Sequence, residues 1–360
     1  AIAAKQRSLD YVVLEQGVLV NSIYRFPPQM VFFTTPELLE VGGLPFVSPY
    51  DKPTRTEALR YYRRVVDTYD LKISFDETAR SIEREEPPPG DGGAEDVVFA
   101  IETHSSRGVN RVRHGRFVVM AIGYFDHPNL IGVPGEDLSH VSHYYSDPHI
   151  HYRQRVVIVG AGNSAAESAL EMFRAGAHVT LVHRGPQLKS TIKYWVRPDI
   201  ENRIKEGSIA ARFNTCLKEI RPTSVLVTSA CGPREEPGPT SGPPRVGGDS
   251  ESSSAAARAS GGGAPRAVIN APNEEEIPAD AVYLLTGYRA DNDLMCRAGV
   301  NLNERQAPIH DPNTFETNVP GLFVAGGATA GVDTGTIFIE NGRFHGEKIV
   351  EVIASRISAL

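Results

Sequence analysis

A glycine-rich segment in the middle of the chain, residues 160–165, has the spacing Gly-x-Gly-x-x-Ala. An apolar, strand-like run precedes it at residues 155–159, and a helix-like stretch follows at residues 166–175. Glycines at this spacing allow a tight turn and a close approach of the backbone to a pyrophosphate, while the helix N-terminus offers free N–H groups. A glycine turn in an unrelated α/β domain is the alternative, but the strand and helix context favours a dinucleotide. The predicted binding residues are Gly160, Gly162, Asn163, Ser164 and Ala165.

The end of the following strand, residues 178–182, indicates which nucleotide is bound. An NAD site usually carries Asp or Glu at this point to bind the ribose 2′-hydroxyl. This chain has His183 and Arg184 instead. A carboxylate would repel a 2′-phosphate, whereas a guanidinium pairs with it. We therefore predict NADPH rather than NADH, bound by these two residues, with Lys189 and Lys193 either joining the site or remaining surface lysines.

Three further segments indicate a second dinucleotide site. Glu15 closes a strand at residues 11–14 and is followed by Gln16, an arrangement that would hold an adenosine ribose. Alone, however, an acid after four apolar residues is only a strand end. Two other strands, residues 117–122 and 321–325, each run into glycine: they end at Gly123 and at Gly326-Gly327.

Composition limits the class of protein. The 360 residues include 37 Lys and Arg against 44 Asp and Glu, so the net charge of −7 disfavours nucleic-acid binding. The hydrophobic share of 41% and the charged share of 22% suit a soluble globular chain of about two domains. A helix is predicted at residues 55–69, with Leu59, Tyr62 and Val66 among its inward residues. The Gly-, Pro- and Ser-rich tract at residues 229–266 is predicted to be a disordered insertion.

Several residues that could do chemistry are interpreted as structural. Cys216, Cys231 and Cys296 lack CxxC spacing and are treated as incidental, which favours a reducing, cytoplasmic setting. The acidic run at residues 274–276 is interpreted as a solvated loop. Four histidines lie in a connector but have no cysteine near them, so no metal site is predicted there. They are His140, His143, His149 and His151.

Seven stretches carry a resemblance that is more specific than any glycine motif. The chain resembles flavoproteins of the low-molecular-weight thioredoxin reductase group, and among these the bacillithiol-disulfide reductase family most closely. The matching stretches span nearly the whole chain except the tract at 229–266. They are residues 20–24, 32–37, 52–55, 123–129, 133–137, 285–288 and 337–346.

The resemblance implies an α/β fold of two nested Rossmann-like domains. An FAD domain would be split between residues 1–147 and 283–360, with an NADPH domain at 148–282 inserted between its parts. It also implies that the numbering begins inside the first helix of the FAD domain, after a strand and glycine loop that can carry a catalytic cysteine, so no catalytic residue is assigned. Gly287 is expected at NADPH. The expected FAD residues are Glu15, Gln16, Asn21, Ser22, Thr34, Gly123, Gly326, Gly327, Ile337 and Phe338.

The sequence also departs from the wider group. The late FAD turn is Gly326-Gly327 rather than Gly-Asp, and the chain has no CxxC for exchange with thioredoxin. The implied enzyme passes hydride from NADPH to FAD and electrons on to a small disulfide such as bacillithiol disulfide, as a homo-oligomer away from membranes and nucleic acids. A flavin monooxygenase is one alternative, although residues 137–143 lack its usual Phe and Gly. A truncated, non-catalytic nucleotide-binding chain is another.

Overall fold

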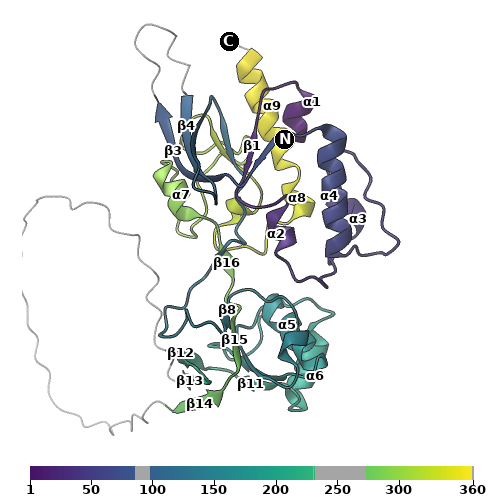
Figure 1. Cartoon of the computed structure of the whole chain (residues 1–360), viewed down its shortest axis with the longest axis vertical. Helices are drawn as coiled ribbons and strands as arrows, with labels where there is room; N and C mark the ends of the chain where they lie inside the picture. The colour runs from purple at the N-terminus through teal and green to yellow at the C-terminus, as the bar shows by residue number, and fades with distance from the viewer. Residues whose placement is uncertain (86–97, 230, 232–272, 359–360) are drawn as a thin grey trace, which may run out of the picture. The chain divides into compact units, whose positions relative to one another are not determined.

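The computed structural model describes residues 1–85, 98–229, 231 and 273–358. The chain forms two compact units (Figure 1). The first contains residues 1–131, 142–150 and 284–360, and the second contains residues 132–141 and 151–283. Residues 132–141, which the sequence-based boundaries place in the FAD domain, therefore group with the second unit. Two backbone hydrogen bonds there account for the difference: Ile220 N–H donates to Pro134 at 2.8 Å, and Val282 N–H donates to His140 at 3.0 Å.

The first unit opens with helix α1 (Ile2–Gln6) and strand β1 (Val13–Glu15), which pairs in parallel with β2 (Ile73–Phe75). Between these strands lie α2 (Asn21–Tyr24), α3 (Pro36–Leu39) and α4 (Arg55–Tyr69). The bounds of α4 are those predicted, because Thr54 and Glu57 form a capping box at its start.

The buried face of α4 differs from the predicted one. Its most buried residues are Ala58, Tyr61, Tyr62 and Val65, whereas Leu59 and Val66 are only half-buried. Tyrosine hydroxyls set this orientation: Tyr62 donates to the Leu39 carbonyl at 3.0 Å, and Tyr61 donates to the Leu44 carbonyl at 2.8 Å. The orientation of α4 therefore depends on hydrogen bonds from tyrosine hydroxyls to backbone carbonyls. The apolar pattern of the sequence does not reveal these bonds.

An antiparallel three-stranded sheet follows, formed by β3 (Thr78–Glu85), β4 (Val98–His104) and β5 (Asn110–Gly115). Strand β6 (Val118–Met120) then pairs in parallel with β17 (Leu322–Val324) from the far end of the chain. The remaining elements of the first unit are β7 (His127–Pro128), β16 (Tyr288–Arg289), α7 (Asn292–Arg297), the 3-10 helix η2 (Gly326–Ala330), α8 (Ile339–Gly342) and α9 (His345–Ser358).

The second unit is built on a five-stranded sheet in the order β11-β10-β9-β15-β8. Strands β9 (Arg155–Val159), β10 (His178–Val182) and β11 (Ala210–Arg212) are parallel. Helix α5 (Asn163–Arg174) connects the first two, and α6 (Arg197–Lys205) connects the next two. Strands β15 (Ala281–Leu284) and β8 (Val141–Ser142) complete the sheet, and the 3-10 helix η1 (His149–His151) precedes β9. The predicted strand–glycine–helix–strand unit at residues 155–182 is thus present.

A second sheet of this unit corrects two predictions. Strands β12 (Cys216–Arg221), β13 (Ser224–Thr228) and β14 (Glu274–Pro278) form it, so the acidic run at 274–276 is a strand and not a loop. Basic side chains pair with these acids. Glu275, for example, forms an ion pair at 2.8 Å with Arg212, the last residue of β11. Cys216 and Cys231 are joined by a disulfide, contrary to the expectation that each is incidental. The predicted insertion at 229–266 lies outside the described residues, apart from residues 229 and 231.

Glu77, the residue before β3, connects the three-stranded sheet to β1 through a buried ion pair and a backbone hydrogen bond. The Glu77 side chain is 1% exposed and accepts two hydrogen bonds from the Arg113 guanidinium, both at 2.9 Å. The Glu77 backbone N–H donates to the Glu15 carbonyl at 3.0 Å. The Arg113 hydrogen bonds lower the pKa of Glu77 to about 2. Glu77 therefore contributes stability above the ordinary pKa of a glutamate, which is lost as the pH falls toward 2.

We predict that Glu77→Gln lowers the free energy of unfolding by about 2–3 kcal/mol, because Arg113 then faces a neutral amide. Urea unfolding followed by circular dichroism measures the change. The acid-sensitive part of the stability between pH 4.5 and 2 should shrink as well. Glu102→Gln, at an exposed position of the same sheet, is the matched control and should change stability by less than about 0.5 kcal/mol. Equal losses in the two variants would contradict the prediction.

Candidate nucleotide and flavin sites

The turn between β9 and α5 has the geometry expected of a phosphate loop. Gly160 adopts a φ of +146° and donates its N–H to the Val182 carbonyl at 3.0 Å, which joins the turn to the end of β10. Gly162 caps α5, and a Cβ added there would meet open space. Ala165 is 1% exposed, so the helix packs closely on the sheet, while Ser164 is exposed in its first turn. The free N–H groups of α5 therefore face an accessible turn.

The Asn163 side chain forms hydrogen bonds with the segment that lies beside this turn. Its side-chain nitrogen donates to the Thr191 carbonyl at 3.2 Å, and its oxygen accepts the Lys193 N–H at 2.9 Å. Lys189 N–H also donates to the Ala161 carbonyl at 3.0 Å. The segment from Lys189 to Lys193 is thereby fixed against the glycine turn. The Lys193 ammonium forms an ion pair with Glu167 at 2.6 Å, which gives it a partner within the protein.

Three basic residues gather at the end of β10. Burial lowers the pKa of His183, and the charges of Lys189 and Arg184 lower it further, so the three groups share one electrostatic environment. Arg184 and Lys189 are exposed. The backbone of His183 is held on both sides, because its N–H donates to the Arg212 carbonyl at 2.9 Å and its carbonyl accepts the Thr215 N–H at 3.0 Å. This cluster can pair with a phosphate dianion.

Glu15 lies at the end of β1 in a partly buried position. Its carboxylate accepts the Gly17 N–H at 2.8 Å. Burial raises the pKa of Glu15, the Gly17 hydrogen bond opposes this, and the charge of Asp126 raises it again. Asp126 also accepts the Gln16 amide at 3.0 Å and pairs with Arg25 at 2.6 Å. The two residues predicted at an adenosine ribose are therefore part of a charged network that includes Asp126, which the sequence reasoning did not single out as a site residue.

The two glycine turns of the first unit come together at one edge. Ala325 N–H donates to the Met120 carbonyl at 3.0 Å, so β6 and β17 end side by side. Gly123 and Gly326 both have positive φ, +63° and +64°, and a Cβ on either would meet open space. A Cβ on Gly327, in contrast, would lie 2.7 Å from the Tyr124 ring. The glycines therefore leave uncovered backbone beside open space, which a side chain at either position would occupy.

The His345 side chain stabilises the turn at Gly326. Its Nδ1 accepts the Gly326 N–H at 3.1 Å, and its ring stacks on Phe315 with centroids 4.2 Å apart. Burial lowers the pKa of His345, and the charges of Lys348 and His310 lower it further. The histidine is therefore held in the neutral form that can accept this hydrogen bond. His345 lies in the matching stretch 337–346, but the sequence assigns it no role because its hydrogen bond with Gly326 appears only in the structure.

The other predicted residues lie in segments of the first unit that pack together, since Ile23 and Phe32 share one hydrophobic cluster on which Ile339 packs. Asn21 packs against Gly17, whose added Cβ would lie 2.5 Å from its oxygen, and Ser22 follows it in α2. Thr34 is 8% exposed. Ile337 approaches Gly342, whose added Cβ would lie 3.3 Å from its side chain. Phe338 meets Phe33 edge to face at 5.5 Å.

Gly287 belongs to a different unit from the other residues predicted at NADPH. It belongs to the first unit, where its carbonyl accepts the Asn129 N–H at 2.9 Å. The Gly160 turn and His183 belong to the second unit. Its assignment to NADPH stays a prediction, as do the roles of the other predicted residues.

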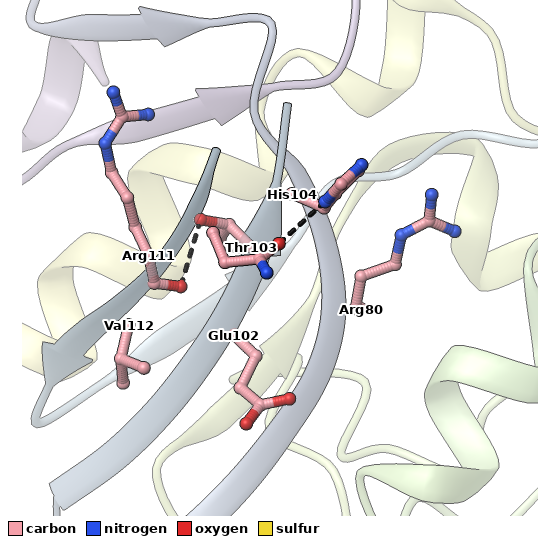
Figure 2. A pocket seen from close by; sticks show the side chains of 7 residues that line it. Arg80, Glu102, Thr103, His104, Arg111 and Val112 are labelled. Atoms are coloured by element: carbon pink, nitrogen blue, oxygen red, sulfur yellow. Dashed lines mark hydrogen bonds between the residues drawn. The ribbon is translucent and has the colours of Figure 1, made fainter. Parts of the chain in front are cut away.

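A cavity of about 540 Å³ lies over the three-stranded sheet. Figure 2 shows the guanidinium groups of Arg80 and Arg111 on opposite sides of the view and the Glu102 carboxylate pointing away from both. The mixed charges do not converge on one point, and none of the predicted cofactor residues lines this cavity. Within the described residues, no helix is both long and apolar enough to cross a membrane, and no cluster of His, Cys, Asp and Glu could hold a metal ion.

Comparison with known proteins assigns the family. The family described as pyridine nucleotide-disulphide oxidoreductase matches residues 1–234 and 261–326. The chain belongs to this family. Bacilliredoxin reductase Bdr of Bacillus subtilis (strain 168) is 34% identical over 357 residues, covering 99% of this chain and 94% of the relative. The chain is therefore an oxidoreductase of a family that uses a flavin and a pyridine nucleotide.

Solved structures support the same assignment. The bacillithiol disulfide reductase Bdr (YpdA) from Bacillus cereus has a TM-score of 0.82 and 31% identity, covering 99% of this chain and 94% of that one. A thioredoxin reductase from T. acidophilum has a TM-score of 0.65 at 20% identity, covering 99% and 93%. That second likeness concerns the fold. The predicted fold class, a two-domain α/β flavoprotein like thioredoxin reductase, and the predicted resemblance to bacillithiol-disulfide reductases are thus confirmed.

We predict that flavin retention by this oxidoreductase falls as the pH drops below the ordinary range of a histidine. Because the pKa of His345 is lowered in the folded protein, the hydrogen bond to Gly326 is fully present above pH 6.5 and is lost as His345 protonates at lower pH. His345→Phe keeps the stacking on Phe315 but cannot accept the N–H. It should weaken flavin binding about fivefold at neutral pH and flatten the pH profile.

Flavin fluorescence during dialysis at several pH values measures this effect. His310→Phe is the matched control, because His310 also stacks on Phe315, at 5.7 Å, while its Nδ1 bonds the Pro308 carbonyl rather than the glycine turn. Removing the charge of His310 should leave the pH dependence in place and move its midpoint slightly upward. A His345→Phe protein that still loses flavin at low pH would show that another group controls the turn.

Proposed function

We propose that the chain is an FAD-dependent reductase that takes hydride from NADPH and passes electrons to a small disulfide such as bacillithiol disulfide. The observation that carries the proposal is the 34% identity to a bacilliredoxin reductase over 99% of the chain. The similarity extends over both units, so it includes both candidate sites. The monooxygenase alternative has less support, because the chain is 34% identical to a bacilliredoxin reductase and 31% identical to a bacillithiol disulfide reductase over 99% of its length.

The residues of the first unit fit FAD. Gly123 and Gly326 provide backbone at the end of a parallel strand pair where an added Cβ would enter open space, so a polar cofactor group can approach the N–H groups closely. Glu15 at the end of β1 would accept from the hydroxyls of the adenosine ribose, and Asp126 orients the neighbouring Gln16. Asn21, Ser22, Thr34, Ile337 and Phe338 complete the proposed surroundings.

The residues of the second unit fit NADPH. Gly160 and Gly162 leave room for the pyrophosphate at the start of α5, where the N–H groups of the first helical turn would bind it. His183 and Arg184 would bind the 2′-phosphate, with Lys189 adding charge nearby. A carboxylate at either position would repel that phosphate. The choice of NADPH over NADH therefore depends on the end of β10.

The protein contributes binding and orientation to the reaction. A bound flavin supplies the chemistry of accepting hydride and releasing electrons to a disulfide. The chain holds the nicotinamide nucleotide through α5 and His183, and the flavin nucleotide through β1 and the two glycine turns. No catalytic residue is assigned among its three cysteines. A homo-oligomeric state and a cytoplasmic setting stay predictions.

A direct test of the function uses the purified chain loaded with FAD. Under anaerobic conditions, NADPH should bleach the flavin absorbance, and bacillithiol disulfide should restore it. NADPH consumption is then compared across bacillithiol disulfide, glutathione disulfide, a quinone and oxygen. Fast turnover with oxygen and none with a disulfide would favour the monooxygenase alternative. FAD binding without any bleaching by NADPH would favour a non-catalytic chain.

We predict that Arg184→Glu raises the KM for NADPH by about 10- to 100-fold, because a charge-assisted pair with the 2′-phosphate is replaced by a repulsion. The KM for NADH, which lacks that phosphate, should change little or fall. Initial rates with each nucleotide measure the ratio. Lys205→Glu makes the same change of charge at an exposed site in the last turn of α6 and should leave the ratio unchanged. Equal effects of Arg184→Glu on both nucleotides would contradict a role in phosphate recognition.

A further inference from the structure

The disulfide of the second unit lies at the open end of a β-hairpin. Cys216 is the first residue of β12 and pairs in register with Thr228, the last residue of β13. Cys231 lies beyond that end, with its Cα 5.5 Å from that of Cys216, a separation typical of disulfides. Cys231 is exposed, whereas Cys216 is half-buried. Cys231 is therefore the residue of the pair that a small thiol can approach from solvent.

The residues that precede Cys216 hold the loop at the end of β10. Thr215 N–H donates to the His183 carbonyl at 3.0 Å, and Asn214 N–H donates to the Gly185 carbonyl at 2.9 Å. These two hydrogen bonds join the start of β12 to both ends of the segment that contains Arg184. The disulfide anchors β12 one residue further along. Opening it would free this end of the hairpin and weaken the support of the loop.

We propose that Cys216–Cys231 is a thiol-exchange site for low-molecular-weight thiols, and that its oxidised state holds the His183–Gly185 loop in position. A small thiolate attacks the sulfur of exposed Cys231, forming a mixed disulfide there while Cys216 leaves as a thiolate and takes up a proton. A second small thiolate attacks the small-molecule sulfur of that mixed disulfide. Cys231 leaves as its thiolate, and a small disulfide is released. Two thiols are thus oxidised as the protein disulfide is reduced.

The exchange connects the site to the thiol pool. Its product is a small disulfide, the class of substrate in the proposed function, and this connection rests on that function. When the pool is oxidised, the reverse exchange closes Cys216–Cys231 and fixes the loop that binds the 2′-phosphate. The enzyme would then hold NADPH most tightly when its disulfide substrate accumulates.

Cys296 provides an internal contrast. It is a free cysteine on α7 of the first unit and is exposed, as Cys231 is, so the contrast between them lies in the thiol and not in access. Burial raises the pKa of its thiol, and Asp293 raises it further, so little thiolate forms at neutral pH. Cys296 should therefore exchange slowly and remain reduced when the Cys216–Cys231 pair is oxidised.

The first test counts thiols in the full chain. After treatment with a small disulfide such as glutathione disulfide and removal of excess reagent, the denatured chain should show one free thiol, and after full reduction it should show three. Cys296→Ser should show none and two. Three free thiols, or three mixed disulfides, after treatment of the wild-type chain would overturn the proposal.

The second test measures the loop itself. Amide hydrogen exchange over residues 183–185 and 212–216 should be about tenfold faster in the reduced chain than in the oxidised chain. Cys231→Ser should behave as the reduced chain under both conditions, and Cys216→Ser should agree with it. Cys296→Ser should still respond to oxidation. Equal exchange in both redox states would overturn the loop-holding role.

NADPH binding separates this proposal from the proposed function. The affinity, measured by the fluorescence change of the nucleotide, should be about fivefold weaker in the reduced chain than in the oxidised chain. If neither form binds NADPH, the proposed function fails, while the thiol count and hydrogen exchange still decide the inference. If both forms bind NADPH equally well, the proposed function stands and the coupling is rejected.

Discussion

The parallel pairing of β6 with β17 is the interaction on which the first unit depends. It joins residues 118–120 to residues 322–324, which are separated in the sequence by the whole second unit. Because parallel strands end at the same edge, Gly123 and Gly326 must lie beside each other. Tyr124 then packs on Gly327, and His345 reaches the Gly326 N–H. The two glycine turns are therefore brought together by a pairing between strands that lie far apart in the sequence.

The second unit uses the same constraint over a shorter stretch of sequence. Strands β9 and β10 are parallel and are connected by α5, so the Gly160 turn and His183 meet at one edge. The Gly160 N–H bonded to Val182 fixes their spacing. Here, strand, turn, helix and second strand are consecutive, which is why this arrangement of elements could be predicted from the sequence in its correct order. The site of the first unit needed partners from both ends of the chain, and the resemblance to a family supplied them.

Local patterns predicted the elements that are stabilised locally. Helix α4 has an apolar period and its own capping box, and β9 is a continuous apolar run. Several strands that were not predicted carry charge instead: β3 is rich in Arg and Glu, β5 contains Arg111 and Arg113, and β14 contains the acidic run at 274–276. Long-range ion pairs stabilise them, such as Arg212 with Glu275. A charged strand resembles a solvated loop until its partners are known, so the sequence alone could not identify these strands.

The side chains that pack on the glycine turns could not be identified from the sequence either, because their partners are distant in it. One of these contacts accounts for the difference between this chain and the wider group at the late turn. The late turn is Gly326-Gly327, where the wider group has Gly-Asp. Any Cβ at position 327 would lie 2.7 Å from the ring of Tyr124, too close for the ring to remain in place. Glycine at 327 therefore leaves room for the Tyr124 ring, and any larger residue at this position, an acid included, would require that ring to move.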